Sequence, residues 1–260
     1  MKVIKACLGV IFAVSLIGSV FASEGGVHLD KVKNNLCDKA SLQRGASLYM
    51  NYCAGCHSLQ FVRYKDMARD IGIVDKKGEV LEKLVNDNLN FISDKVNDPI
   101  SVATPKVLSA AWFGVSPPDL SLVSRVRGKD WLYTYLRSFY EDPKRPWGVN
   151  NVVFPDVGMP HVLLILQGLQ TPVYKTEKIT DDQGNPTEKK IVSHLELKKP
   201  GTLTPEAYDK AMTDLVNFLD YVGEPHKLER KRLGVWVLLF LVVLTFFAYL
   251  LKREYWKDVH

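Results

Sequence analysis

The sequence predicts a mainly α-helical domain that contains one β-hairpin and is followed by a single membrane-spanning helix. Apolar residues recur at helical spacing in several segments, most clearly between residues 205 and 222. Strand-like runs at 173–179 and 191–197 flank a turn at 182–186, which is typical of a hairpin. Near the C-terminus, residues 233–251 contain no charged side chain. At ~1.5 Å per residue such a run spans one hydrocarbon core.

The first 22 residues have the organisation of a secretory signal peptide. Lys2 and Lys5 supply positive charge, residues 6–20 are apolar, and Ala22 offers the small residue that a signal peptidase reads. A retained N-terminal anchor is the alternative, which the shortness of the apolar run disfavours. We therefore expect cleavage before Ser23 and export across the inner membrane of a bacterium.

The apolar segment at 233–251 is expected to anchor the exported chain in that membrane. A basic segment at 227–232 precedes it and further lysine and arginine residues follow it, so the distribution of positive charge does not set the orientation. The signal peptide sets it instead, and places residues 23–226 in the periplasm and the tail at 252–260 in the cytoplasm.

Between these segments lie about 210 residues, enough for one domain with its own core. The formal net charge of +5 includes the basic juxtamembrane segment. No basic patch of the kind that binds nucleic acid stands out, so we expect no nucleic-acid partner. Two polar stretches, 72–104 and 172–203, are predicted to be surface insertions, with contact surfaces for partner subunits as the alternative.

Four helices are expected in the exported domain. Thr204, Pro205 and Glu206 give the clearest start, because they combine a capping hydroxyl, a proline at the first position and an early acid. Ser41 is predicted to cap an earlier helix. The expected ranges are 42–53, 128–142, 161–167 and 205–222.

A Cys-x-x-Cys-His motif, formed by Cys53, Cys56 and His57, ends the first of these helices. Two cysteines at this spacing can each form a thioether with a haem vinyl group, and the adjacent histidine can then bind the iron. A disulfide redox pair needs no histidine, and a zinc site needs a second pair of ligands. No cysteine follows Cys56. The motif therefore predicts one covalently bound haem c.

The second axial ligand is predicted by elimination among the methionines. Met50 lies on the motif's own helix and Met212 belongs to an apolar stripe that is typical of a core. Met159 stands on irregular backbone before Pro160, about a hundred residues after His57, where it is free to approach a haem. Met159 is the preferred candidate, with His161 as the alternative.

The chain resembles the cytochrome c1 family, the haem subunits of ubiquinol:cytochrome c oxidoreductase (bc1) complexes. The resemblance covers nearly all of the exported region in order, and its motifs are jointly specific. The matching segments are 41–58, 61–64, 117–121, 125–128, 154–164 and 217–232.

The resemblance implies a cytochrome c-like domain with His57 and Met159 as axial ligands. It also implies that Arg125 faces a haem propionate and that the backbone carbonyl of Pro118 receives the second ring nitrogen of His57. Cys37 departs from this scheme because it has no partner once Cys7 is removed and the motif cysteines are used.

The resemblance further implies a membrane-anchored carrier that takes one electron from a Rieske iron-sulfur protein and passes it to a cytochrome c. Cytochrome b would carry out the quinol chemistry in a dimeric complex, and this chain would need no catalytic acid, base or nucleophile. Two alternatives are an electron carrier of another respiratory assembly and a haem sensor or enzyme with an open sixth position.

Overall fold

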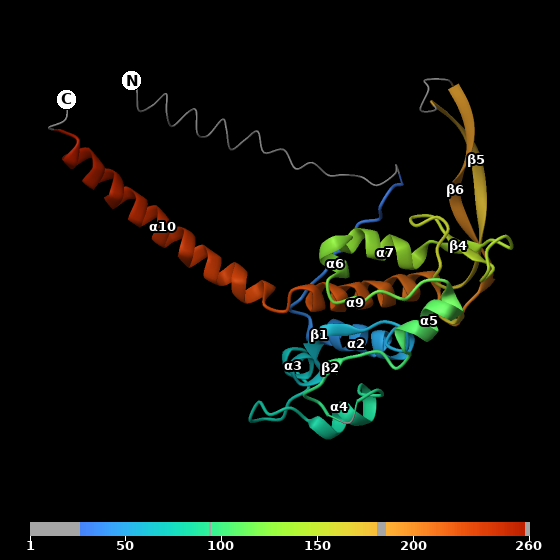
Figure 1. Cartoon of the computed structure of the whole chain (residues 1–260), viewed down its shortest axis with the longest axis horizontal. Coiled ribbons are helices and arrows are strands. Elements are labelled where there is room, and N and C mark those ends of the chain that lie inside the picture. The colour runs from blue at the N-terminus through green and yellow to red at the C-terminus, as the bar shows by residue number, and fades with distance from the viewer. Residues whose placement is uncertain (1–26, 94, 181–185, 258–260) are drawn as a thin grey trace.

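The computed structural model describes residues 27–93, 95–180 and 186–257. The expected signal peptide, with Cys7, lies outside the described residues, as do the last three residues of the tail and most of the turn at 182–186. The structure consists mainly of helices with short strand pairs, one long hairpin and an apolar C-terminal helix (Figure 1). The mainly α class predicted from the sequence is therefore confirmed.

The helices of the described residues are α2 (Lys39–Tyr52), α3 (Tyr64–Asp70), α4 (Glu82–Asn88), α5 (Lys106–Phe113), α6 (Val123–Val126), α7 (Lys129–Arg137), α8 (Leu164–Gln167), α9 (Pro205–Gly223) and α10 (Lys227–Tyr255). The strands form three antiparallel pairs: β1 (Leu59–Arg63) with β2 (Pro99–Ile100), β3 (Phe139–Glu141) with β4 (Val149–Asn151), and β5 (Gly168–Thr180) with β6 (Pro186–Pro200).

The core is centred on the crossing of α2 and α9, which lie against each other in Figure 1. The rings of Tyr49 and Phe218 meet there with centroids 5.9 Å apart. At Gly45 the two backbones approach so closely that an added Cβ would lie 2.2 Å from the carbonyl oxygen of Asp214. Arg44 binds the carboxylate of Asp214 with two hydrogen bonds of 2.6 and 2.9 Å. Because Gly45 has no side chain, α2 and α9 can pack this closely. This contact fixes the position of α2, and the haem-attachment motif directly follows α2.

The helix boundaries agree with the sequence in part. Thr204 caps α9 by accepting a hydrogen bond from the backbone N–H of Ala207, as predicted. The prediction of Ser41 as the cap of α2 is wrong, because Asp38 accepts from the Ser41 N–H and α2 starts at Lys39. The helix expected over 128–142 ends at Arg137, since the chain turns into strand β3.

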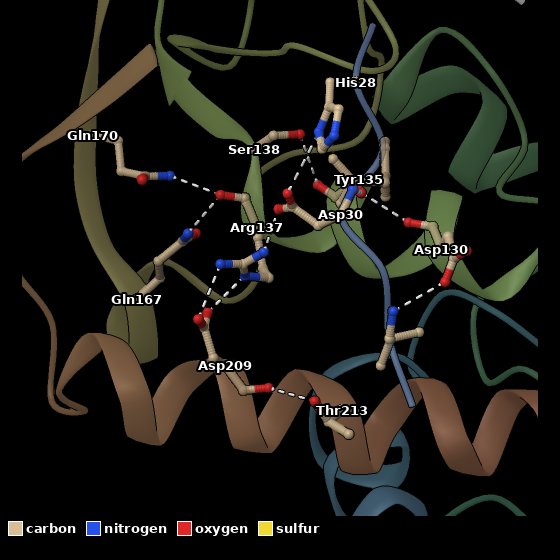
Figure 2. A network of polar contacts seen from close by, with 12 residues as sticks. His28, Asp30, Asp130, Tyr135, Arg137, Ser138, Gln167, Gln170, Asp209 and Thr213 are labelled. Atoms are coloured by element: carbon tan, nitrogen blue, oxygen red, sulfur yellow. Dashed lines mark hydrogen bonds and ion pairs between the residues drawn. The ribbon is translucent and has the colours of Figure 1, made fainter. Parts of the chain in front are cut away.

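Arg137 fixes the end of α7 to three other parts of the domain (Figure 2). Its guanidinium binds the carboxylate of Asp209 on α9 through bonds of 2.6 and 2.9 Å, and it also pairs with Asp30 of the N-terminal segment. The backbone carbonyl of Arg137 accepts hydrogen bonds from Gln167 at the end of α8 and from Gln170 near the start of β5. Helix α7 is thereby held in a defined position against α9.

The hairpin and the C-terminal helix both leave this helical body. Strands β5 and β6 are longer than the expected runs at 173–179 and 191–197, and Figure 1 shows them rising away from the helices. Helix α8 is shorter than expected, because 161–163 are not helical. Helix α10 includes both the basic segment and the apolar run, and none of its described residues is buried in the domain.

Candidate haem site

The Cys-x-x-Cys-His motif forms a tight turn at the C-terminal end of α2. The backbone N–H of His57 donates to the carbonyl of Cys53 at 2.9 Å, which closes the turn. The buried hydroxyl of Tyr49 donates to the carbonyl of His57 at 2.6 Å. Cys53 is buried, Cys56 is half-buried, and neither forms a disulfide. Burial raises the pKa of Cys53 to about 12, which is unlike the reactive thiolate of a redox pair.

The imidazole of His57 is oriented by the loop between α5 and α6. Its Nδ1 lies 2.7 Å from the carbonyl oxygen of Pro118, the contact implied by the family resemblance. Because a carbonyl only accepts hydrogen bonds, Nδ1 carries the proton and the Nε2 lone pair is left for a metal. Burial lowers the pKa of His57, and the bond to Pro118 only partly opposes that effect. The ring is therefore suited to act as a neutral ligand.

Asp119 ties this loop to the motif. Its carboxylate accepts hydrogen bonds from the hydroxyl of Ser58 at 2.7 Å and from the backbone N–H of Gln60 at 2.9 Å. The backbone N–H of Ser121 donates to its other oxygen at 2.8 Å. Burial raises the pKa of Asp119, but these hydrogen bonds outweigh that effect and lower it overall. The carboxylate thus helps to keep the Pro118 carbonyl next to His57.

A cavity lies beside the motif and is lined almost entirely by apolar groups. Four groups with haem-binding chemistry line it, namely the thiols of Cys53 and Cys56, the His57 ring and the Met159 thioether. The remaining lining includes Phe113, Val115, Pro117, Pro160 and Val162. Two thiols, an imidazole and a thioether around an apolar cavity fit a haem c.

Met159 enters this cavity from a small aromatic cluster. It packs against the buried residues Phe139, Val149 and Val157. The hydroxyl of Tyr135 on α7 donates a hydrogen bond to the Met159 sulfur at 3.3 Å. Burial raises the pKa of Tyr135, so its hydroxyl stays protonated and remains a donor.

The alternative ligand, His161, lies elsewhere. Its ring stacks on Phe139 with centroids 4.8 Å apart and planes 3° apart, and within the described residues it does not line the cavity. Burial lowers its pKa to about 4, so it is neutral. Met50 is buried on α2, while Met67 and Met212 are fully buried in the main core. Met159 is thus the methionine that lines the cavity in the described part of the chain.

Arg125, which the resemblance implied as a propionate partner, lies beside the C-terminal end of α9. A Cβ added at Gly223 would lie 3.4 Å from its side chain, and its charge acts on Glu224. Among the described residues that line the cavity, Arg125 is absent. Two residues further on, Arg127 lies over the rings of Trp131 and Phe154, at 5.2 and 5.9 Å from their centroids. Trp131 in turn stacks on Tyr135, so Arg127 belongs to the aromatic cluster beside Met159.

Two residues of this site did not emerge from the sequence. Asp119 lies in the matching segment 117–121, but it is exposed and belongs to no periodic pattern from which a role could be predicted. Tyr135 lies in the helix predicted over 128–142, where a tyrosine is usually a packing residue. The aromatic residues at 131, 135 and 139 recur every four positions, and this spacing indicates a continuous aromatic face.

A mainly helical domain with a Cys-x-x-Cys-His turn and an apolar cavity lined by His57 and Met159 defines a c-type cytochrome. Comparisons with known proteins identify the family of c-type cytochromes to which the chain belongs. The model of the Cytochrome C1 family matches residues 31–171 and 199–259. The interval between these two ranges falls within the hairpin formed by β5 and β6.

Three known proteins that are similar to this chain differ in their identity to it and in the share of each chain that is matched. Cytochrome c1 of Allochromatium vinosum is 51% identical over 93% of this chain and 94% of the relative. The ammonia monooxygenase gamma subunit of Nitrosomonas europaea is 41% identical over all of both chains. Cytochrome b/c1 of Bradyrhizobium diazoefficiens is 28% identical over 86% of this chain, but over only 34% of its own length.

The chain belongs to the cytochrome c1 family, the haem subunits of bc1 complexes. It carries one covalently bound haem c, as the motif predicted. Its homologues are anchored in membranes, and the described residues contain one helix that is long and apolar enough to cross a bilayer.

Proposed function

We propose that this chain accepts one electron from a Rieske iron-sulfur protein and passes it to a cytochrome c during quinol oxidation. The observation that carries the proposal is the apolar cavity, which is lined by an imidazole and a thioether from residues about a hundred positions apart. When bound, the haem supplies an iron that alternates between its ferric and ferrous states, and so holds one electron.

Cys53 and Cys56 would attach the haem through thioethers, and His57 Nε2 and Met159 Sδ would bind its iron. The thioether and the apolar lining favour ferrous iron and hence a raised reduction potential. The Pro118 carbonyl fixes the plane and tautomer of His57. A propionate contact for Arg125 has little support from its place beside α9, whereas Arg127 lies in the cluster that contacts Met159.

We further propose that α10 anchors the chain in a bacterial inner membrane, with residues 23–226 on the periplasmic side. Cytochrome b would be the neighbouring subunit in a dimeric complex. A relative named cytochrome b/c1, about one third of which matches this chain, supports that partnership.

The relative named ammonia monooxygenase gamma subunit supports a second candidate, an electron carrier of a different assembly. The sixth position is not expected to be open, as a haem sensor would require, because Met159 lines the cavity. Addition of carbon monoxide to the reduced protein tests that point, since a six-coordinate haem should bind it poorly.

Affinity isolation of the tagged full-length chain from membranes distinguishes the two assemblies. Co-purification of cytochrome b and a Rieske protein, with quinol-driven reduction of the haem, is the expected result. Co-purification of ammonia monooxygenase subunits instead would favour the second candidate.

Acid acetone extraction tests the covalent attachment of the haem. The haem should stay on the wild-type polypeptide, and it should be extracted from a variant with Cys53→Ser and Cys56→Ser.

A further inference from the structure

We propose that Tyr135 is a positioning residue for the Met159 sulfur, and that its hydrogen bond to this sulfur raises the reduction potential of the haem. The inference rests on the proposed role of Met159 as an axial ligand. It adds a residue that neither the family resemblance nor the motif includes.

The contact itself is well formed. The Tyr135 hydroxyl lies 3.3 Å from the Met159 sulfur, which is within hydrogen-bond range for this atom. A thioether sulfur has two lone pairs and is a weak acceptor. One lone pair can therefore receive the hydroxyl proton while the other remains for the iron.

The position of the Tyr135 ring is fixed by its neighbours. Trp131 stacks on one side with a centroid distance of 4.9 Å and planes 9° apart, and Phe139 meets the ring edge-to-face at 5.2 Å. The Tyr135 backbone carbonyl accepts a hydrogen bond of 2.8 Å from the side-chain amide of Asn151. These contacts aim the hydroxyl at the sulfur.

The helix that carries Tyr135 is braced as well. Two residues after Tyr135, Arg137 joins α7 to Asp209 on α9 and to Asp30 of the N-terminal segment (Figure 2). Because the backbone of α7 is held in this way, the hydroxyl reaches the sulfur without ordering a flexible segment. A preorganised bond of this kind costs little entropy when the sulfur binds iron.

The effect on potential follows from electron donation. A hydrogen bond to the sulfur withdraws electron density and makes the thioether a poorer donor. Ferric iron depends more on donation from its ligands than ferrous iron does, so the bond disfavours the ferric state. Removal of the hydroxyl should therefore lower the potential.

The test is Tyr135→Phe in the full-length haem-loaded protein in detergent. Phenylalanine keeps the ring contacts with Trp131 and Phe139 and removes only the donor. We expect the equilibrium constant for reduction to fall about three- to tenfold. At ~59 mV per tenfold change this is a lowering of about 28 to 59 mV in a redox titration. The ferric absorbance band that reports sulfur ligation should shift but persist.

The matched control is Tyr133→Phe on the same helix. The ring of Tyr133 lies under the Arg137 guanidinium at 4.5 Å, and its hydroxyl interacts with Thr213 on α9. This variant also removes one hydroxyl from α7, but not the one at Met159, so its potential should equal that of the wild type.

Four results would count against the proposal. An unchanged potential and sulfur band in Tyr135→Phe would refute the role of Tyr135 alone. An equal fall in Tyr133→Phe would assign the effect to the helix and refute it too. A wild-type protein without the sulfur band would refute Met159 ligation, and with it this inference. Should Tyr135→Phe not fold, 3-fluorotyrosine at position 135 is a stronger donor and should raise the potential; no rise would refute the proposal.

Discussion

The orientation of His57 depends on a short chain of specific contacts. Its Nδ1 is bound to the Pro118 carbonyl, and the next residue, Asp119, fastens that loop to Ser58 and Gln60 beyond the motif. The loop that orients His57 is thus joined both to the imidazole ring and to the residues that follow the motif. Loss of the Asp119 carboxylate should loosen the loop without removing any atom that faces the cavity.

Substitution of Asp119 should change the acid stability of the protein. Hydrogen bonds hold the pKa of Asp119 below its usual range. A carboxyl group with a lowered folded-state pKa stabilises the fold above its unfolded pKa of about 3.9, and this stability is lost as the pH falls through the folded value. Asp119→Asn should be less stable near neutral pH, and the difference from wild type should shrink in acid.

Urea unfolding of the two proteins between about pH 7 and about pH 3 measures this difference. The effect should be modest, because the carboxylate is partly exposed. Parallel stability curves over the whole range would show that the Asp119 hydrogen bonds contribute nothing specific to the fold.

At this scale the residues predicted the motif and Met159, and the resemblance implied the contact between Pro118 and His57, but the roles of Asp119 and Tyr135 were not predicted. Elimination among the methionines selected one that lines the cavity, because Met50 and Met212 belong to helical patterns, whereas Met159 stands on irregular backbone. The same kind of elimination cannot distinguish Arg125 from Arg127. The two are only two positions apart on a short helical turn, and their side chains therefore point in different directions.

Among the elements, the contact between α2 and α9 determines where the haem motif lies. The contact depends on Gly45, because any Cβ there would meet the Asp214 carbonyl oxygen at 2.2 Å and the Phe218 Cβ at 2.6 Å. Neither atom belongs to the end of a flexible side chain, so the helices themselves would have to separate.

Gly45→Ala should therefore destabilise the domain by about 1–3 kcal/mol through overpacking, despite the better helix propensity of alanine. Gly234→Ala on α10, where a Cβ would meet nothing within 4 Å, is the matched control and should be neutral. Thermal unfolding followed by the haem absorbance compares them. Equal melting temperatures for all three proteins would contradict the close α2–α9 contact.

The sequence predicted elements better where local chemistry decides them than where packing does. Thr204, Pro205 and Glu206 are local features, and α9 starts where they place it. The end of α7 at Arg137 is set by the pairing of β3 with β4 and by the contacts of Arg137 with Asp209 and Gln167. These partners are distant in sequence, so no local sequence pattern predicts the contacts.

On the scale of the whole molecule, the haem domain and α10 are largely independent. Lys227 contacts Asp220 and Arg230 contacts Glu224 at the junction, but no described residue of α10 is buried. The apolar surface of α10 is therefore left for a bilayer, and the domain core should not need it.

A chain that stops after Arg232 should be soluble and keep its haem spectrum, since both junction ion pairs remain. Fractionation of cells into membrane and periplasmic extracts, followed by absorbance spectroscopy, measures this. A truncated protein that still requires detergent would reveal a second anchor, such as an uncleaved N-terminal segment.

The central claim is that His57 and Met159 hold the haem iron, and a redox titration of Met159→His tests it most directly. A thioether favours ferrous iron relative to an imidazole, so the substitution should lower the midpoint potential and abolish the ferric sulfur band, while Cys53 and Cys56 keep the haem attached. Each ~59 mV of lowering corresponds to a tenfold weaker tendency to accept the electron. An unaltered potential and sulfur band would contradict the claim and show that another side chain occupies the sixth position.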